Sequence, residues 1–98
     1  MPDRTREQIT DRVLAAVAKA TGMPSAKVTL ESTWGDLGVS GDFEFLCVTV
    51  DIDRALVYGI DPLITKEQAE KELNPAKMKK LTPMKKLVDK VCELCGVS

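Results

Sequence analysis

The 98-residue sequence contains no histidine, and its aromatic residues are one Trp, one Tyr and two Phe. Histidine is the commonest acid–base group near pH 7 and the commonest zinc ligand. Its absence argues against a Ser-His-Asp hydrolase and a histidine metal site, so we expect neither an enzyme nor a metal protein. No apolar run is long enough to span a bilayer. The polar start, Met1-Pro2-Asp3-Arg4, does not resemble a secretory signal, and we expect a cytoplasmic protein.

Cysteine is scarce and odd in number, with Cys47, Cys92 and Cys95. An odd count without a secretory signal argues against a disulfide framework. Cys92 and Cys95 have CxxC spacing, which leaves a small redox or metal protein as an alternative. Redox pairs lie at helix N-termini, whereas this pair lies near the end of an expected helix, where the dipole disfavours a thiolate. We interpret both as packing residues and Cys47, within an apolar run, as a core residue.

The formal net charge is only -1, but acidic and basic residues are unevenly distributed along the chain. Residues 29–63 contain seven acidic residues and one basic residue, and residues 64–98 contain eight basic and five acidic residues. Nucleic-acid-binding domains are more often basic overall with interleaved aromatic residues, so we expect no nucleic-acid partner. The length and the apolar fraction of 44% predict a single domain, residues 1–98, with its own core, and we expect a monomer.

A first helix is predicted after Thr5, because Thr5 and Gln8 have the spacing of a capping box and Gly22 supplies a stop. Its apolar stripe comprises Ile9, Val13, Ala16, Val17 and Ala20. Residues 23–41, rich in Gly and Ser, then predict a long loop. Trp34 lies in this loop, and we expect its large ring to anchor the loop to the helices.

The segment 43–60 is ambiguous by periodicity. Residues 48–53 alternate apolar and polar side chains, as in a strand, but the apolar positions of the segment also fit a helix. As a helix it would be apolar over most of its circumference, which is typical of a buried helix. Thr65 and Gln68 form a second capping-box spacing, and a short helix is predicted near residues 66–73.

The last predicted helix begins after Thr82, as N-cap, and Pro83, as first helical residue. Asn74-Pro75 separates it from the short helix before it. Its apolar residues keep helical spacing until Gly96, which stops the helix.

The order of these elements resembles the acyl carrier proteins. Asp36-Leu37-Gly38 stands as it does in the loop of that family, after residues 27–34, which resemble the family's loop segment. Residues 65–71 are similar to its short third helix, and residues 81–91 to the start of its last helix. The resemblance implies an all-α, four-helix bundle with a long loop between helices 1 and 2 and a short third helix. It also resolves the ambiguous segment towards helix.

The family's functional motif is Asp-Ser-Leu at the start of its second helix, where the serine carries 4'-phosphopantetheine. The matching residues here are Gly41, Asp42 and Phe43, in a register that needs one extra residue between Gly38 and Gly41. A carboxylate cannot replace the hydroxyl, because its phosphate adduct would be a labile acyl phosphate. Asp42 either supplies a fixed negative charge where the family carries its phosphate, or is simply a favourable first-turn residue. In this register no cofactor is expected.

Ser40 offers an alternative. If the register slips by two residues, Ser40 takes the place of the serine and the chain is an atypical carrier bearing 4'-phosphopantetheine. The simpler interpretation is that Ser40 is a serine of the kind that commonly precedes helices.

The resemblance also implies a docking surface, since basic partner enzymes recognise an acidic second helix in this family. The matching acidic residues are Asp36, Asp42, Glu44, Asp51 and Asp53. The alternative is a solvated acidic face. The later lysines form a basic patch that we interpret as solvated, with anionic lipid headgroups as an alternative; they are Lys77, Lys79, Lys80, Lys85 and Lys86.

Together these features predict an acyl-carrier-like domain associated with fatty acid, polyketide or lipid acyl metabolism. In the preferred reading it is a non-catalytic binding module without the prosthetic arm. Its partners would be acyl-metabolism enzymes.

Overall fold

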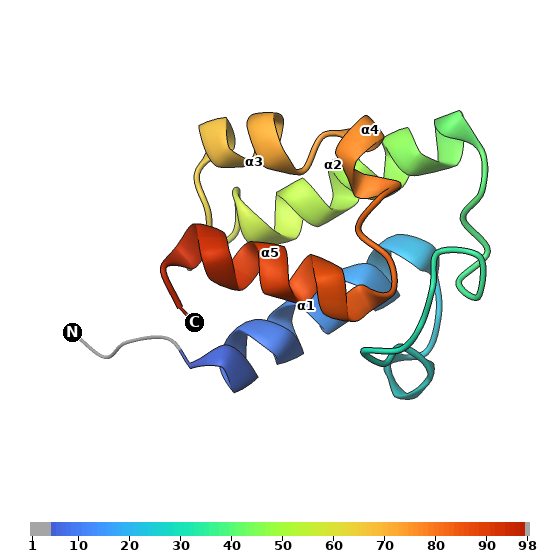
Figure 1. Ribbon diagram of the computed structural model, residues 1–98, viewed down its shortest axis with the longest axis horizontal. Helices are drawn as coiled ribbons and strands as arrows, with labels where there is room; N and C mark the ends of the chain where they lie inside the picture. Colours follow the sequence, from blue (N-terminus) through green and yellow to red (C-terminus); the bar gives the residue numbers. More distant parts are fainter. Residues whose placement is uncertain (1–4, 98) are drawn as a thin grey trace.

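The computed structural model describes residues 5–97, and within that range every regular element is helical (Figure 1). Helix α1 spans Arg6–Thr21, α2 spans Asp42–Leu56 and α5 spans Met84–Cys95. Two shorter helices, α3 (Lys66–Glu72) and α4 (Pro75–Met78), lie between α2 and α5, and a single 3-10 turn, η1 (Ser25–Lys27), lies in the first loop. The all-α class predicted from the sequence is therefore confirmed.

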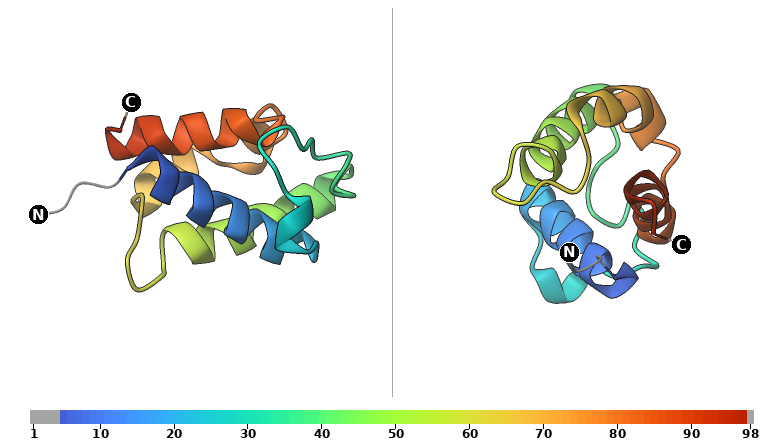
Figure 2. Two further views of the ribbon diagram at one scale, coloured as in Figure 1. Left: turned by 90° about the horizontal axis from the view of Figure 1, so that it is seen from below. Right: turned by 90° about the vertical axis from the view of Figure 1, so that its left-hand side faces the viewer.

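The helices surround one core. Helix α1 packs against both α2 and α5, and α4 packs against α2. Figure 2 shows α1 between α5 and α2, with the two short helices closing the remaining side. The fully buried side chains come from all five α-helices or their caps; among them are Ile9, Val13, Ile52, Leu56, Leu73, Met78, Leu87 and Val91. No helix in the described range is both long enough and apolar enough to cross a membrane.

The first helix forms as its sequence predicts. The Thr5 hydroxyl accepts a hydrogen bond from the amide of Gln8 at 3.1 Å, and the Gln8 side chain accepts one from the Thr5 amide at the same distance. Gly22 ends the helix with φ of 73°, in the left-handed region that favours glycine. The segment 43–60 is helical up to Leu56, because Phe45, Val48, Ile52 and Leu56 bury one face against the core.

The long loop is fixed to the bundle by its apolar residues, as expected. The indole N–H of Trp34 donates a hydrogen bond to the Met78 carbonyl at 2.8 Å, and its ring meets Phe45 edge to face at 5.7 Å. Val28, Leu37 and Val39 are buried with it. This loop also caps α5, since the amides of Met84 and Lys85 donate to loop carbonyls. The loop therefore ties α2, α4 and α5 together.

Two boundaries differ from prediction. Asn74-Pro75 ends the short helix and also starts the additional helix α4. The Asn74 side chain is the N-cap, accepting a hydrogen bond from the Lys77 amide at 3.0 Å, and Pro75 is the first helical residue. Thr82 was predicted as the N-cap of the last helix, but the N-cap is Pro83. No side-chain cap is needed there, because loop carbonyls accept the hydrogen bonds of the first amides.

The prediction that α2 is buried around most of its circumference is wrong. Phe43, Leu46 and Val50 are 76%, 49% and 42% exposed. Cys47, predicted as a core residue, is exposed as well. The reason is that α2 carries two apolar stripes, and the bundle covers only the one that contains Phe45, Val48 and Ile52.

Candidate functional site

The candidate site is the start and outer face of α2, where the sequence placed the predicted functional residues. Gly41 is the N-cap of α2, and Asp42 is its first helical residue. Gly41 has no side chain that could accept hydrogen bonds from the first amides of the helix. The Glu44 side chain instead reaches back to the backbone that precedes the helix. Its carboxylate accepts a hydrogen bond from the Gly41 amide at 2.9 Å and lies 3.4 Å from both the amide and the hydroxyl of Ser40.

Ser40 is exposed and precedes the N-cap by one residue. Its hydroxyl lies 3.4 Å from Glu44, so the serine belongs to the cap. The backbone donors of Gly41 and Ser40 stabilise the charged carboxylate and lower the pKa of Glu44.

Asp42 is held by a partner from a distant segment. Its carboxylate forms an ion pair with Lys79, which follows the last residue of α4. The Lys79 ammonium also lies 5.8 Å from the centre of the Phe45 ring. The hydrogen bond from Lys79, together with its charge, lowers the pKa of Asp42. The first residue of α2 is therefore an exposed carboxylate whose charged form is favoured by its pairing with Lys79.

The other acidic residues are also engaged locally. Asp36 accepts a hydrogen bond from the Thr33 amide, and the Thr33 hydroxyl accepts one from the Asp36 amide, both at 3.1 Å. Asp51 lies 3.8 Å from Arg54 on the same helix. Exposed pairs of this kind add little stability, so Asp51 remains available to solvent and to a partner.

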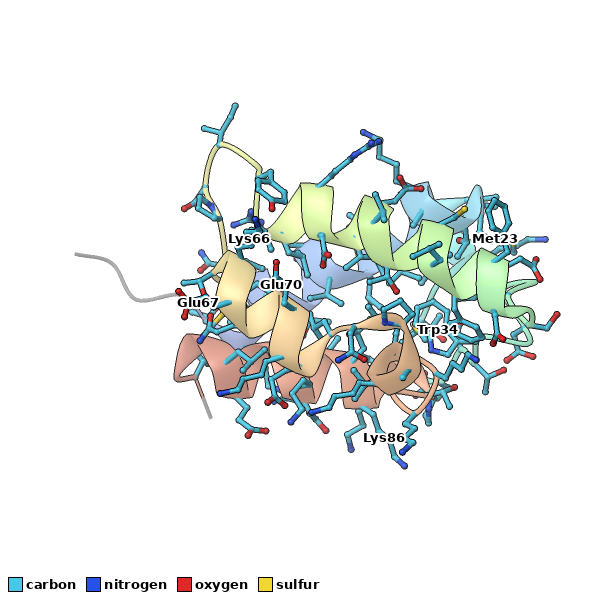
Figure 3. All side chains as sticks on the ribbon, turned by 90° about the horizontal axis from the view of Figure 1, so that it is seen from above. Met23, Trp34, Lys66, Glu67, Glu70 and Lys86 are labelled. Carbon is cyan, nitrogen blue, oxygen red and sulfur yellow. The ribbon has the colours of Figure 1, made fainter. Side chains whose placement is uncertain are left out.

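Asp53 differs from the rest because it faces α3. It is only partly exposed, and its Oδ1 atom is buried without a hydrogen-bond partner among the described residues. It lines a small cavity of about 50 Å³ that includes Lys66 and Glu70 of α3, two residues seen beside α2 in Figure 3. Burial, and then the charge of Glu70, raise the pKa of Asp53 to about 6.

The predicted acidic residues therefore do not form one continuous surface. Asp42 and Asp53 are about three turns apart and share one edge of α2, while Glu44 and Asp51 are about two turns apart and share the opposite edge. Between these edges lies an exposed apolar stripe, which we define as Phe43, Leu46, Cys47 and Val50. Asp36 lies outside α2, in the loop.

Sequence reasoning missed this apolar stripe, although a signal was present. Phe43, Leu46 and Val50 recur at i, i+3 and i+7, which is a helical period of their own. That period is separate from the one that starts at Phe45 and is buried. The bundle covers only the stripe that starts at Phe45 and leaves the other in solvent.

The CxxC pair offers no exposed dithiol. Cys92 is 1% exposed, and the partly buried Cys95 thiol lies 3.1 Å from the Leu63 carbonyl. Both cysteines lie in the last turn of α5, near its C-terminus, as predicted. Within the described range no group of three or more His, Cys, Asp or Glu side chains is placed to hold a metal ion.

The basic residues after α3 do not form one patch. Lys77 pairs with Glu72 at 3.9 Å and Lys79 pairs with Asp42. Lys80, Lys85 and Lys86 are exposed, and Figure 3 shows Lys86 on the side of the molecule opposite α2.

No protein-family model matches this chain, and no curated protein or solved structure matches it.

Proposed function

We propose that this chain is an acyl-carrier-like, non-catalytic binding module that docks on enzymes of fatty acid, polyketide or lipid acyl metabolism through α2. The observation that carries the proposal is Asp42. It is the first helical residue of α2, at the position that matches the family's serine, and it is held by Lys79. A carboxylate there supplies the negative charge of a phosphodiester without the chemistry that attaches an arm.

The order of the helices supports the same proposal. A helix, a long pinned loop, a second long helix, a short third helix and a final helix follow one another as in the acyl carrier proteins. Helix α4 is an addition to that pattern, and Lys79, the residue that follows it, pairs with Asp42. The proposal places the module in the cytoplasm, where acyl carriers meet their enzymes.

The docking surface in this proposal is mixed. The apolar stripe supplies area to bury, and Glu44 and Asp51 supply negative charge at one edge. A basic partner would be attracted over a distance set by the ionic strength, so its association rate falls as salt is added. The acidic surface alone is a weaker candidate, because Asp53 faces α3 and Asp42, although exposed, is already paired with Lys79.

The test is an intact-mass measurement after co-expression with a broad-specificity phosphopantetheinyl transferase. We expect the wild type to keep its unmodified mass. The Asp42→Ser variant restores a hydroxyl at the family position and should gain about 340 Da, the mass of the arm. A modified wild type would overturn the proposal, and an unmodified Asp42→Ser would remove the support for the register and for the carrier-type surface.

A second candidate, an atypical carrier modified at Ser40, is favoured by one observation. The Ser40 hydroxyl is exposed next to the start of α2. In that case the wild type gains the arm and Ser40→Ala does not. A modification that survives Ser40→Ala places the arm on another residue and rejects this candidate.

A further inference from the structure

Helix α3 is attached to its two neighbouring helices in different ways. Towards α5, the Gln68 side chain donates a hydrogen bond to the Leu94 carbonyl at 3.0 Å. Glu72 also pairs with Lys90 of α5 at 3.5 Å. Towards α2, among the residues that the structure describes, no hydrogen bond or ion pair joins the two helices. The α2 side of α3 is therefore held by packing alone.

Little buried apolar surface supports α3. The helix has seven residues, of which only Ala69 is buried, and Leu73 at its C-cap is buried as well. Isolated helices shorter than about 12–15 residues are marginal in water, so α3 depends on its contacts with the bundle to stay folded. Segments with few buried contacts are the ones that open locally, without unfolding of the whole domain.

The contact between α2 and α3 places two carboxyl groups beside one small cavity. Asp53 of α2 and Glu70 of α3 both line it. The other titratable side chains that line it are Tyr58, from the loop after α2, and Lys66, whose ammonium lies 3.9 Å from Glu70. Figure 3 shows Lys66 and Glu70 beside α2. The cavity, of about 50 Å³, has room for only a few water molecules, so the buried Oδ1 atom of Asp53 is poorly hydrated.

The charged form of Asp53 is therefore disfavoured while α3 is closed on α2. Burial, and then the charge of Glu70, raise the pKa of Asp53 to about 6 in the closed form. When α3 opens, Asp53 regains water and moves away from Glu70, so its pKa returns towards 3.8. The closed form binds the proton more tightly, and opening should increase as pH rises from 3.8 to about 6 and then level off.

We propose that α3 is a proton-controlled segment, which closes on α2 when Asp53 is protonated and opens locally when Asp53 is ionised. Opening uncovers Ala69 and the adjacent side of α2, which are apolar surfaces separate from the apolar stripe. The bundle thereby gains a surface whose exposure depends on pH. This inference needs only the contact between α2 and α3, and it stands or falls independently of the proposed function.

Native-state hydrogen exchange, followed by NMR from about pH 4 to about pH 7, tests the proposal. The reporters are the amides of Ala69 and Leu73, which donate to the carbonyls of Thr65 and Ala69. After correction for intrinsic exchange rates, we expect their opening to be about tenfold greater at pH 7 than at pH 4. Their opening should respond little to low concentrations of urea, because a local opening exposes little surface.

Amides in the long helices give the reference for global unfolding. Val17 of α1 and Val91 of α5 are fully buried, and their amides should be much better protected and more sensitive to urea than those of α3. If the amides of Ala69 and Leu73 show the protection and the urea dependence of Val17 and Val91, α3 opens only with the whole domain and the proposal is wrong.

Three variants identify the group that responds to pH. Asp53→Asn should remove the pH dependence of α3 opening and keep α3 closed at pH 7, because an amide does not titrate. Glu70→Gln removes only the second charge and should weaken the dependence. Asp11→Asn makes the same substitution at an exposed position of α1 and should retain the wild-type dependence. An opening that does not change with pH in the wild type, or that still changes with pH in Asp53→Asn, would overturn the proposal.

Discussion

Replacing Asp53 by asparagine should stabilise the protein at neutral pH. The Asp53 Oδ1 atom is buried without a hydrogen-bond partner among the described residues, and Glu70 adds a second negative charge nearby. Both effects disfavour the carboxylate, and they raise the pKa of Asp53 from 3.8 to about 6. Asparagine has nearly the same shape, carries no charge and brings an amide N–H₂ that can donate to Glu70.

The direction of the stability change and the pH range over which it occurs follow from the pKa of Asp53 in the unfolded and folded states. Well below the unfolded pKa of 3.8 the residue is protonated in both states and the substitution changes little. Between 3.8 and about 6 the unfolded chain loses the proton while the folded chain keeps it, so the wild-type free energy of unfolding falls as pH rises. The full shift corresponds to about 3 kcal/mol at 1.36 kcal/mol per pKa unit. Solvent contact screens the site, and we expect a gain of about 1–2 kcal/mol at pH 7.

Urea denaturation at several pH values between about 4 and 8 measures the difference between variant and wild type. Asp51→Asn is the matched control, because Asp51 lies on the same helix but is exposed; its effect should stay within about 0.5 kcal/mol. The reasoning is refuted if the gain from Asp53→Asn is the same at pH 4 as at pH 7, or if the substitution destabilises the protein at pH 7.

Three further substitutions test other contacts. Trp34→Phe keeps a buried ring but leaves the Met78 carbonyl without its indole donor, and urea denaturation followed by circular dichroism should show a loss of about 1–3 kcal/mol. Lys79→Met removes the partner of Asp42, so the pKa of Asp42 measured by NMR should rise, whereas Lys80→Met should leave it unchanged. Gly22→Ala should lose about 1–2 kcal/mol because φ is 73°, and Gly35→Ala, without positive φ, should lose much less.

The ends of α1 could be predicted from the sequence because local chemistry decides them. The capping box at Thr5 and Gln8 and the glycine at position 22 act within one turn of the chain. The same holds for the capping box at Thr65, which starts α3. The start of α5 could not be predicted in this way. Its first amides are satisfied by the carbonyls of Leu30 and Ser32, about fifty residues earlier in the chain.

In the candidate site, too, the features set by neighbouring residues could be predicted and those set by distant contacts could not. The sequence placed Ser40, Asp42 and Glu44 together, because they are neighbours in the chain and precede a helix. It could not place Lys79 beside Asp42 or Glu70 beside Asp53, since both contacts depend on how α4 and α3 fold back onto α2. It also could not decide which of the two apolar stripes of α2 faces the core. Periodicity shows that two apolar stripes exist, but the packing of the other helices determines which of them is buried.

The pairing of Asp42 with Lys79 bears on the outer face as well. Lys79 pairs with the first residue of α2 and its ammonium lies 5.8 Å from the centre of the Phe45 ring, so two contacts link the first turn of α2 to the residue that follows α4. Phe43 follows Asp42 directly and points away from the core, with 76% of its surface exposed. These contacts restrain the backbone from which Phe43 projects, so less backbone freedom would be lost in the proposed docking. In the proposed function, Asp42 would therefore contribute to docking by ordering the start of α2 and not by carrying an arm.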